Sequence, residues 1–189
     1  MELWSAIANS VIALATAGGV VIAARGLHTW RKQLKGTDDY ELAKKTLFSV
    51  YKLRDGLRYV RQPFLAVGEA SSEDAEKKIP WEESAYLNRW KNVREALVLL
   101  ETNSLECEVV WGKGIPNARM EINRSVGTLN HAVTMFFRQL QDKKWQEDFE
   151  KQSSAILYEH DENDPYNVEL NKHIKNFEDI LKPHLGRND

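Results

Sequence analysis

Arg124 and His131 are the two residues whose types and spacing best suit chemistry on a phosphate group. They are seven positions apart, so on a helix that turns about 100° per residue they fall within roughly 20° of each other and about 10.5 Å apart. A histidine transfers protons near neutral pH, and an arginine stabilises the charge that grows on a phosphate in a transition state. The pair could therefore be catalytic, or it could be an ordinary solvated or interface pair.

The element that must position this pair is a helix predicted over residues 116–141. Its apolar residues recur at three- and four-residue steps, as one side of a helix requires. They are Ile122, Val126, Leu129, Val133, Phe136 and Leu140. The face that carries Arg124 and His131 lies about 180° from this stripe, so neither side chain can point into the core that the stripe forms. We expect the pair to be exposed or to lie between molecules.

Three arginines share one face of a second helix, predicted over residues 38–62. They are Arg54, Arg58 and Arg61, on the same face as Tyr40, Ala43, Leu47 and Val50. Arginine binds phosphate in bidentate fashion, so this stripe could hold a nucleotide, an RNA phosphate or a lipid headgroup. The alternative is pairing with carboxylates of the next helix, because partly buried arginines need partners. The carboxylates in question are Glu82, Glu83 and Glu95.

Composition argues against several classes of enzyme. Lys and Arg number 26 and Asp and Glu 28, so the net charge of −2 carries no general signature of polyanion binding. The sequence has no Cys/His cluster with zinc spacing, no glycine-rich phosphate loop and no G-x-S-x-G or H-E-x-x-H motif. We therefore expect no metal and no cofactor, and we favour a non-enzymatic role over a catalytic one. The single cysteine, Cys107, cannot form an intrachain disulfide, in agreement with a reducing compartment.

The segment Leu3–Ala24 contains no charge, and 16 of its 22 residues are apolar. As a helix it spans about 33 Å, which matches a hydrocarbon core of roughly 30 Å. Trp4 and Trp30 could then lie in opposite headgroup layers. A cleaved signal peptide is the alternative, but the segment lacks a basic leading region and its apolar run is long. Residues 1–36 are therefore predicted to form a single transmembrane helix and a basic connector.

Basic residues follow the predicted span, and none precedes it. They are Arg25, Arg31, Lys32 and Lys35. The positive-inside rule then places the N-terminus outside and residues 37–189 in the cytoplasm. We expect a single-pass protein of the bacterial inner membrane, with the lipid bilayer as a partner.

Small and weakly polar residues share one side of the predicted span. They are Ser5, Ala6, Asn9, Ser10, Ala13, Thr16 and Ala17. Small residues let helices approach closely in lipid, and several copies could turn the polar ones toward a shared axis. This pattern favours a homo-oligomer with a wet pore. The alternative is a monomeric anchor whose polar groups bond to their own helix.

The rest of the chain shows helical periodicity throughout. Asp38 and Glu41 could form a capping box at the start of the helix over 38–62, which Pro63 ends. Further helices are predicted over 81–103 with an extension at 107–111, over 116–141, over 145–157, and from Asp164 and Pro165 to about residue 182, with a mobile loop over 68–78. The sequence shows no convincing alternating strand. We therefore expect an all-α protein in which a transmembrane helix precedes a cytoplasmic bundle of four to five helices.

The segment Arg124-Ser-Val-Gly-Thr-Leu-Asn-His131 resembles the R-x(4–6)-H motif of HEPN domains. These all-α bundles often bring Arg and His of two protomers together and cleave RNA without metal, so one implied function is a membrane-tethered ribonuclease. The leading span, the helical domain and the motif together resemble the small membrane accessory proteins of type VI-B CRISPR systems. That resemblance implies an oligomeric pore that permeabilises the inner membrane in antiviral defence, coupled to an RNA-guided RNA nuclease. A non-catalytic membrane scaffold is the third possibility.

Overall fold

The computed structural model describes residues 2–66, 68–70, 72, 80–112, 114–142, 156–158 and 164–186. Within residues 2–15 and 140–142 it describes the backbone, together with the side chain of Ile7. Of the predicted helix over 145–157 the structure describes only Ile156 and Leu157, and of the predicted loop over 68–78 it describes only residues 68–70 and 72. Every regular element in the described ranges is a helix, so the predicted all-α class is confirmed there. The chain divides into two units, one ending at Glu41 and one beginning at Leu42. The predicted boundary after residue 36 stays a prediction.

Helix α1, Glu2–Val60, contributes residues to both units. The prediction of a separate helix that begins at Asp38 is wrong, because α1 continues through this position. The Thr37 hydroxyl donates to the backbone oxygen of Gln33 at 3.1 Å, which is a bond made inside a helix and not by a residue that caps one. Gly36 disfavours a helix by only about 1 kcal/mol relative to alanine, too little to stop one.

In the first unit, the side chains from Thr16 to Asp38 are all exposed. They include the large apolar side chains of Val20, Ile22 and Trp30. No helix in the described part of the chain is both long enough and apolar enough to cross a membrane. The transmembrane helix predicted at Leu3–Ala24 is thus unsupported and stays a prediction. Of the small-residue stripe, Thr16 and Ala17 are exposed, whereas the side chains of Ser5, Ala6, Asn9, Ser10 and Ala13 lie outside the described ones.

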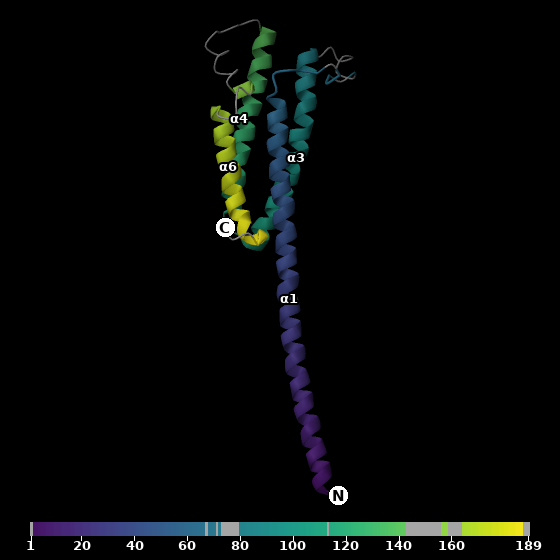
Figure 1. The fold of residues 1–189 in the computed structure, drawn as a ribbon. Helices are drawn as coiled ribbons and strands as arrows, with labels where there is room; N and C mark the ends of the chain where they lie inside the picture. The colour runs from purple at the N-terminus through teal and green to yellow at the C-terminus, as the bar shows by residue number, and fades with distance from the viewer. Residues whose placement is uncertain are drawn as a thin grey trace. The chain divides into compact units, whose positions relative to one another are not determined.

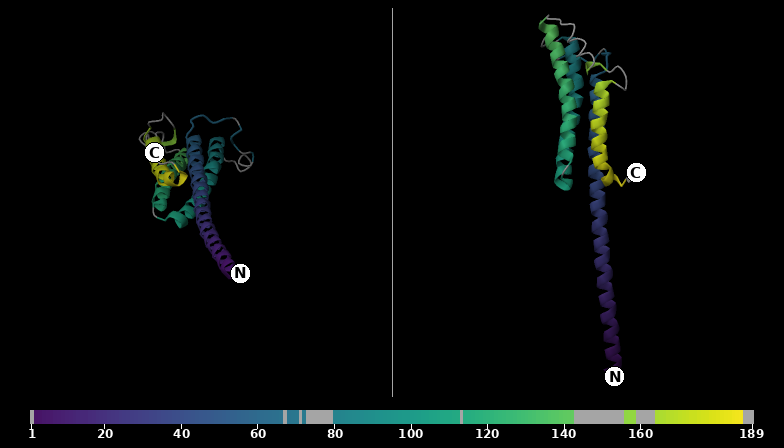
Figure 2. Two further views of the ribbon diagram at one scale, coloured as in Figure 1. Left: turned by 60° about the horizontal axis from the view of Figure 1, so that its bottom comes forward. Right: turned by 90° about the vertical axis from the view of Figure 1, so that its left-hand side faces the viewer.

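The second unit is a bundle of helices. Its members are the part of α1 from Leu42 onward, α3 (Trp81–Trp111), α4 (Ile115–Asp142) and α6 (Pro165–Leu181), followed by the short 3-10 helix η1 (Lys182–Leu185). Figures 1 and 2 show these helices side by side with their axes nearly aligned. Successive helices run antiparallel, as in an up-and-down bundle.

Within the bundle, α1 packs against α3 and α6. It lies close to α3 at Gly56, where an added Cβ would lie 3.3 Å from a methyl group of Val93. Toward α6, the Tyr51 hydroxyl donates to a carboxylate oxygen of Glu178 at 2.8 Å. Gly56 of α1 therefore faces α3, and a hydrogen bond from Tyr51 joins α1 to α6.

Helix α4 completes the bundle by packing against α3 and α6. Its Phe137 meets Tyr86 of α3 edge to face, with ring centroids 5.3 Å apart. Its Ser125 lies against α6, where its Oγ is 3.0 Å from Nδ1 of His173. The residues of both contacts are buried, so α4 is joined to α3 by aromatic packing and to α6 by polar bonds.

Most of the predicted apolar stripes form the core. The buried members are Ala43, Val50, Leu57, Tyr86, Trp90, Val93, Leu100, Ile122, Val126, Leu129, Val133, Leu170, Ile174, Phe177 and Leu181. Tyr40 is an exception and is exposed, because it lies on the turn of α1 that precedes Leu42, the first buried residue among the described side chains.

Two helix ends also agree with the sequence prediction. The extension at 107–111 belongs to α3, which ends at Gly112 with a φ of 76°, a backbone conformation that glycine adopts without strain. At the start of α6, Asp164 Oδ1 accepts from the backbone N–H of Asn167 at 2.9 Å, and Pro165 is the first helical residue.

Candidate functional site

Arg124 and His131 both project from the exposed face of α4. Neither side chain forms a hydrogen bond or an ion pair with another residue in the described ranges, so both are accessible to a partner. Ser125, which lies between them in sequence, is buried. The structure therefore keeps the pair together on one outer face of α4.

The predicted stripe of Arg54, Arg58 and Arg61 does not form a joint anion site. Arg54 lies at the surface, with its Nε 2.9 Å from the carboxylate of the adjacent Asp55. Arg58 is half-buried, and its Nε has no hydrogen-bond partner among the described residues. Arg61 is fully buried and cannot bind an external anion. The three side chains point into three different environments, because the face they share turns from solvent into the core toward the end of α1.

Arg61 instead holds the start of α6 against the end of α1. Its Nη1 lies 3.0 Å from Asp164 Oδ2 and 2.9 Å from Asn167 Oδ1, and its Nη2 lies 3.2 Å from Asp164 Oδ1. Its Nε and Nη2 also donate to the backbone oxygens of Ile156 at 2.7 Å and Tyr158 at 3.0 Å. The ion-pair alternative is thus correct for Arg61, with a partner 103 positions away. The carboxylates predicted for it, Glu82, Glu83 and Glu95, are not its partners in the described structure.

Asp164 is buried in this pair while it also caps α6. Burial alone would raise the pKa of its carboxyl group. Hydrogen bonds from Arg61 and from the backbone outweigh burial, so the pKa of Asp164 lies below its ordinary value. The carboxylate therefore stays charged, as both of its roles require.

A second buried arginine, Arg89 of α3, was not singled out from the sequence. It donates to the backbone oxygens of Gln62 at 2.7 Å and Phe64 at 2.6 Å, and it pairs with the carboxylate of Glu69. The hydrogen bond from Arg89 is the main reason why the pKa of Glu69 is lowered. The signal in the sequence was an arginine inside the apolar stripe between Tyr86 and Val93, since a charge at a core position needs a nearby partner.

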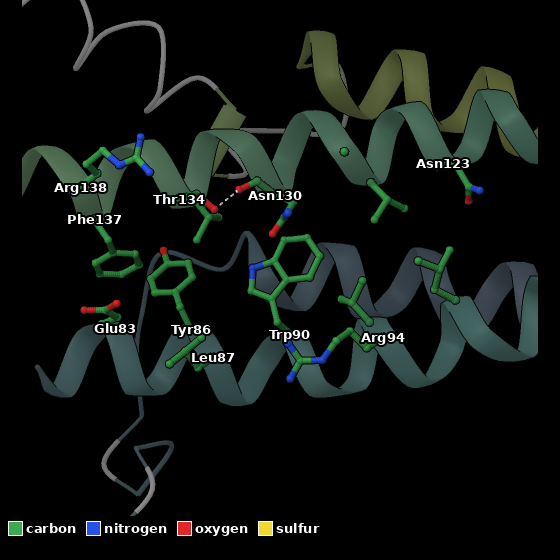
Figure 3. Close-up of a pocket in the computed structure, with 15 residues that line it drawn as sticks. Glu83, Tyr86, Leu87, Trp90, Arg94, Asn123, Asn130, Thr134, Phe137 and Arg138 are labelled. Atoms are coloured by element: carbon green, nitrogen blue, oxygen red, sulfur yellow. Dashed lines mark hydrogen bonds between the residues drawn. The ribbon is translucent and has the colours of Figure 1, made fainter. Parts of the chain in front are cut away.

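A groove of about 720 Å³ lies between α3 and α4 (Figure 3). Aromatic rings of Tyr86, Trp90 and Phe137 line it, and the amides of Asn123 and Asn130 reach it from α4. Two buried polar atoms in this lining, Trp90 Nε1 and Asn123 Oδ1, have no hydrogen-bond partner in the described part of the chain. Concave, largely apolar sites with a few polar groups are typical of ligand pockets.

Charged side chains flank this groove on both helices. Arg94 comes from α3 and Arg138 from α4, and both are exposed and make no ion pair with the residues described. Glu83 is the single carboxylate in the lining. The lining of described residues therefore carries one more positive than negative charge.

A second cavity, of about 450 Å³, shares Glu83, Tyr86 and Phe137 with the groove. It continues toward Pro63 and Tyr158, at the end of the bundle where α3 begins. Burial and the neighbouring Tyr158 raise the pKa of Tyr86 to about 12, so its hydroxyl remains protonated at physiological pH.

Ser125 and His173 form the one close pair of a hydroxyl and an imidazole in the described residues, and Glu169 Oε1 lies 3.9 Å from the other ring nitrogen. Ser125 and His173 are both buried between α4 and α6, and the Tyr166 hydroxyl donates to the Ser125 backbone oxygen at 3.1 Å. A nucleophile needs access to its substrate, so this constellation serves packing.

No group of acidic, cysteine or histidine residues within the described ranges could hold a metal ion. Comparison with models of protein families, with curated proteins and with solved structures finds no match.

Proposed function

We propose that this protein is a membrane-attached effector of antiviral defence that assembles through its N-terminal helix and permeabilises the bacterial inner membrane. The resemblance to the accessory proteins of type VI-B CRISPR systems supports this function and suggests coupling to an RNA-guided RNA nuclease. In this proposal residues 3–24 lie in lipid, the N-terminus faces outward, and the helical bundle lies in the cytoplasm.

The observation that carries the proposal is the exposed apolar surface of α1. Val20 is 64% exposed, Ile22 is 73% exposed, and Trp30 is 58% exposed. Burying such a side chain is worth about 1.5–3 kcal/mol, so a run of them on one helix calls for a covering environment. Lipid or the same helix of other copies would supply it. The exposed Arg25 follows Val20 and Ile22, and the exposed Arg31 follows Trp30, as the positive-inside rule expects for a cytoplasmic end.

Small residues support association between copies. An added Cβ at Gly18 or at Gly19 would meet nothing within 4 Å in a single chain, so another helix can approach this part of α1 closely. The predicted stripe with Ala13 and Ala17 lies in the same segment. Substituting Ala13→Leu or Asn9→Leu is therefore expected to lower the mass of the full-length particle in detergent.

Membrane attachment is tested by placing a charge in the middle of the uncharged run. Leu14→Lys is expected to release the full-length chain from bacterial membranes in a carbonate wash, because a lysine at the centre of a span costs about 2.5–3.5 kcal/mol. Thr29→Lys adds the same charge within the basic connector and should leave attachment unchanged. Release of the unmodified chain, or equal retention of both variants, would contradict the proposal.

Permeabilisation is tested with liposomes that contain a fluorescent dye and the full-length protein. Dye release by the unmodified chain and its loss in Ala13→Leu would support a pore. A chain that stays monomeric at all concentrations and releases no dye would instead support a scaffold.

A metal-independent ribonuclease is the second candidate, and the shared exposed face of Arg124 and His131 favours it. The test is RNA cleavage by the full-length protein with a chelator present, compared between His131→Ala and His28→Ala, which changes another exposed histidine. Loss of cleavage in His131→Ala alone would support this function. Equal cleavage by both variants would identify contamination and exclude it.

A further inference from the structure

We propose that the groove between α3 and α4 is a binding site for a nucleoside phosphate, with the base between the aromatic and amide side chains and the phosphate at one of the two exposed arginines, Arg94 or Arg138. Figure 3 shows the indole of Trp90 lying between the two helices, beside Tyr86 and below Asn130. This site goes beyond the proposed function and does not depend on membrane attachment.

The unpartnered polar atoms are the first argument for a ligand. Trp90 is 7% exposed, and its N–H has no hydrogen-bond acceptor among the described residues. Asn123 Oδ1, in the same lining, has no donor there. A buried donor and a buried acceptor left unpaired destabilise a fold, so their presence in one groove indicates that another molecule completes them.

The combination of rings and amides indicates which kind of molecule this is. Tyr86, Trp90 and Phe137 offer aromatic surfaces against which a planar ring can pack. Asn123 and Asn130 each carry both a donor and an acceptor, which match the edge of a nucleobase. A fatty acid would fill the apolar part of the groove but would leave the indole N–H and the amides without partners.

The charges indicate an anionic group on the ligand. Arg94 and Arg138 are exposed cations of the lining, and guanidinium groups bind phosphate through paired hydrogen bonds. The groove volume of about 720 Å³ lies in the range of pockets that hold small ligands. A single nucleotide is therefore compatible with the groove in size, polarity and charge.

Ligand entry requires a local change in the lining. Trp90 Nε1 has almost no accessible surface in the empty groove, so a ligand that reaches it must displace neighbouring side chains. Asn130 and Thr134 are exposed at the α4 side of the groove and can change rotamer without disturbing the core. Binding is thus expected to alter the fluorescence of Trp90.

The test is calorimetric titration of the full-length protein in detergent with AMP, UMP, adenosine and inorganic phosphate. We expect one AMP or UMP per chain. Trp90→Phe keeps most of the ring but removes the donor and should weaken nucleotide binding about fivefold. Trp81→Phe, at the exposed start of α3 and outside the lining, should bind as the unmodified chain does.

The phosphate contact is tested separately with surface variants that do not threaten the fold. Arg94→Gln combined with Arg138→Gln should weaken AMP about tenfold and adenosine less than about twofold. Lys91→Gln, which removes another exposed cation of α3, should change neither. No binding of AMP or UMP at millimolar concentration, or binding that all these substitutions leave unchanged, would overturn the site. Membrane retention of Trp90→Phe shows separately whether the proposed function holds.

Discussion

Replacing Arg61 with methionine is the most informative test of how the bundle is held together. Arg61 is fully buried and donates to Asp164, Asn167 and two backbone oxygens, while its guanidinium lies 4.6 Å from the Tyr166 ring centroid. Methionine fills much of the same volume but leaves the Asp164 carboxylate buried without its cation. The measured loss therefore reports mainly the unpaired charge.

The expected loss of stability is about 3–5 kcal/mol, the usual result of removing one partner of a buried ion pair. With a urea dependence of about 2 kcal/mol per molar, the unfolding midpoint falls by about 2 M. Arg54→Met is the matched control on the same helix. Its pair with Asp55 is solvent-exposed, so the loss there should be below about 1 kcal/mol.

A double variant separates the charge from the other bonds of Arg61. Asp164→Asn removes the carboxylate charge and keeps an amide oxygen that can cap α6. Arg61→Met with Asp164→Asn is therefore expected to be more stable than Arg61→Met alone. The assay is urea unfolding of the full-length protein followed by tryptophan fluorescence. A loss for Arg61→Met no larger than that for Arg54→Met would refute the reasoning.

Three further predictions follow from the same structure. Gly127→Ala is expected to stabilise the chain by about 0.5–1 kcal/mol, because an added Cβ meets nothing within 4 Å. Gly56→Ala is expected to give no such stabilisation, because its Cβ would lie 3.3 Å from a methyl group of Val93. Thermal unfolding measures both variants, and a lower Tm for Gly127→Ala would contradict the argument. Asp164 and Glu69 have lowered pKa values in the folded chain. The stability that they contribute is therefore complete above their ordinary pKa values of 3.8 and 4.5, and it is lost as the pH falls through the lowered pKa values. Urea unfolding between about pH 2 and 7 should show this loss of stability, and Asp164→Asn should make the loss smaller. Burial raises the pKa of the Cys107 thiol, so iodoacetamide should modify it in urea and not in the folded protein; equal rates in both states would show that the thiol is not protected.

The sequence predicts the bundle well because the apolar residues of its helices recur at three- and four-residue steps. The period of the apolar residues fixes α3, α4 and α6, and the pair Asp164 and Pro165 fixes the start of α6. The break expected at Asp38 is absent, because a capping box motif is compatible with the interior of a helix when the preceding turns are also helical. Local signals therefore identify helices more securely than they identify where one helix stops.

The buried arginines show what periodicity cannot supply. Arg61 was correctly placed near a partly buried surface, but nothing local could select Asp164 from the chain's other carboxylates. Trp90 was correctly assigned to the core, yet the missing partner of its N–H depends on which residues of α4 lie opposite. Both properties arise only when helices distant in sequence are brought together.

Arg61 and Arg89 act at the same end of the bundle, where α1 ends and α3 and α6 begin. Each donates to backbone carbonyl groups of residues that lie between the long helices. Arg61 does so at Ile156 and Tyr158, and Arg89 does so at Gln62 and Phe64. Buried arginines that bind backbone oxygens in this way hold the residues between helices in place without adding apolar surface.

Tyr86 connects this end of the bundle, where Arg61 and Arg89 lie, to the groove. It lines both cavities, and its ring centroid lies 5.8 Å from the guanidinium of Arg89. A molecule that displaces the Tyr86 ring would therefore also change the surroundings of the Arg89 guanidinium. Because Arg89 holds Glu69 and the backbone after α1, a ligand in the groove is expected to change the protection of that segment from hydrogen exchange before it changes the protection of the helices.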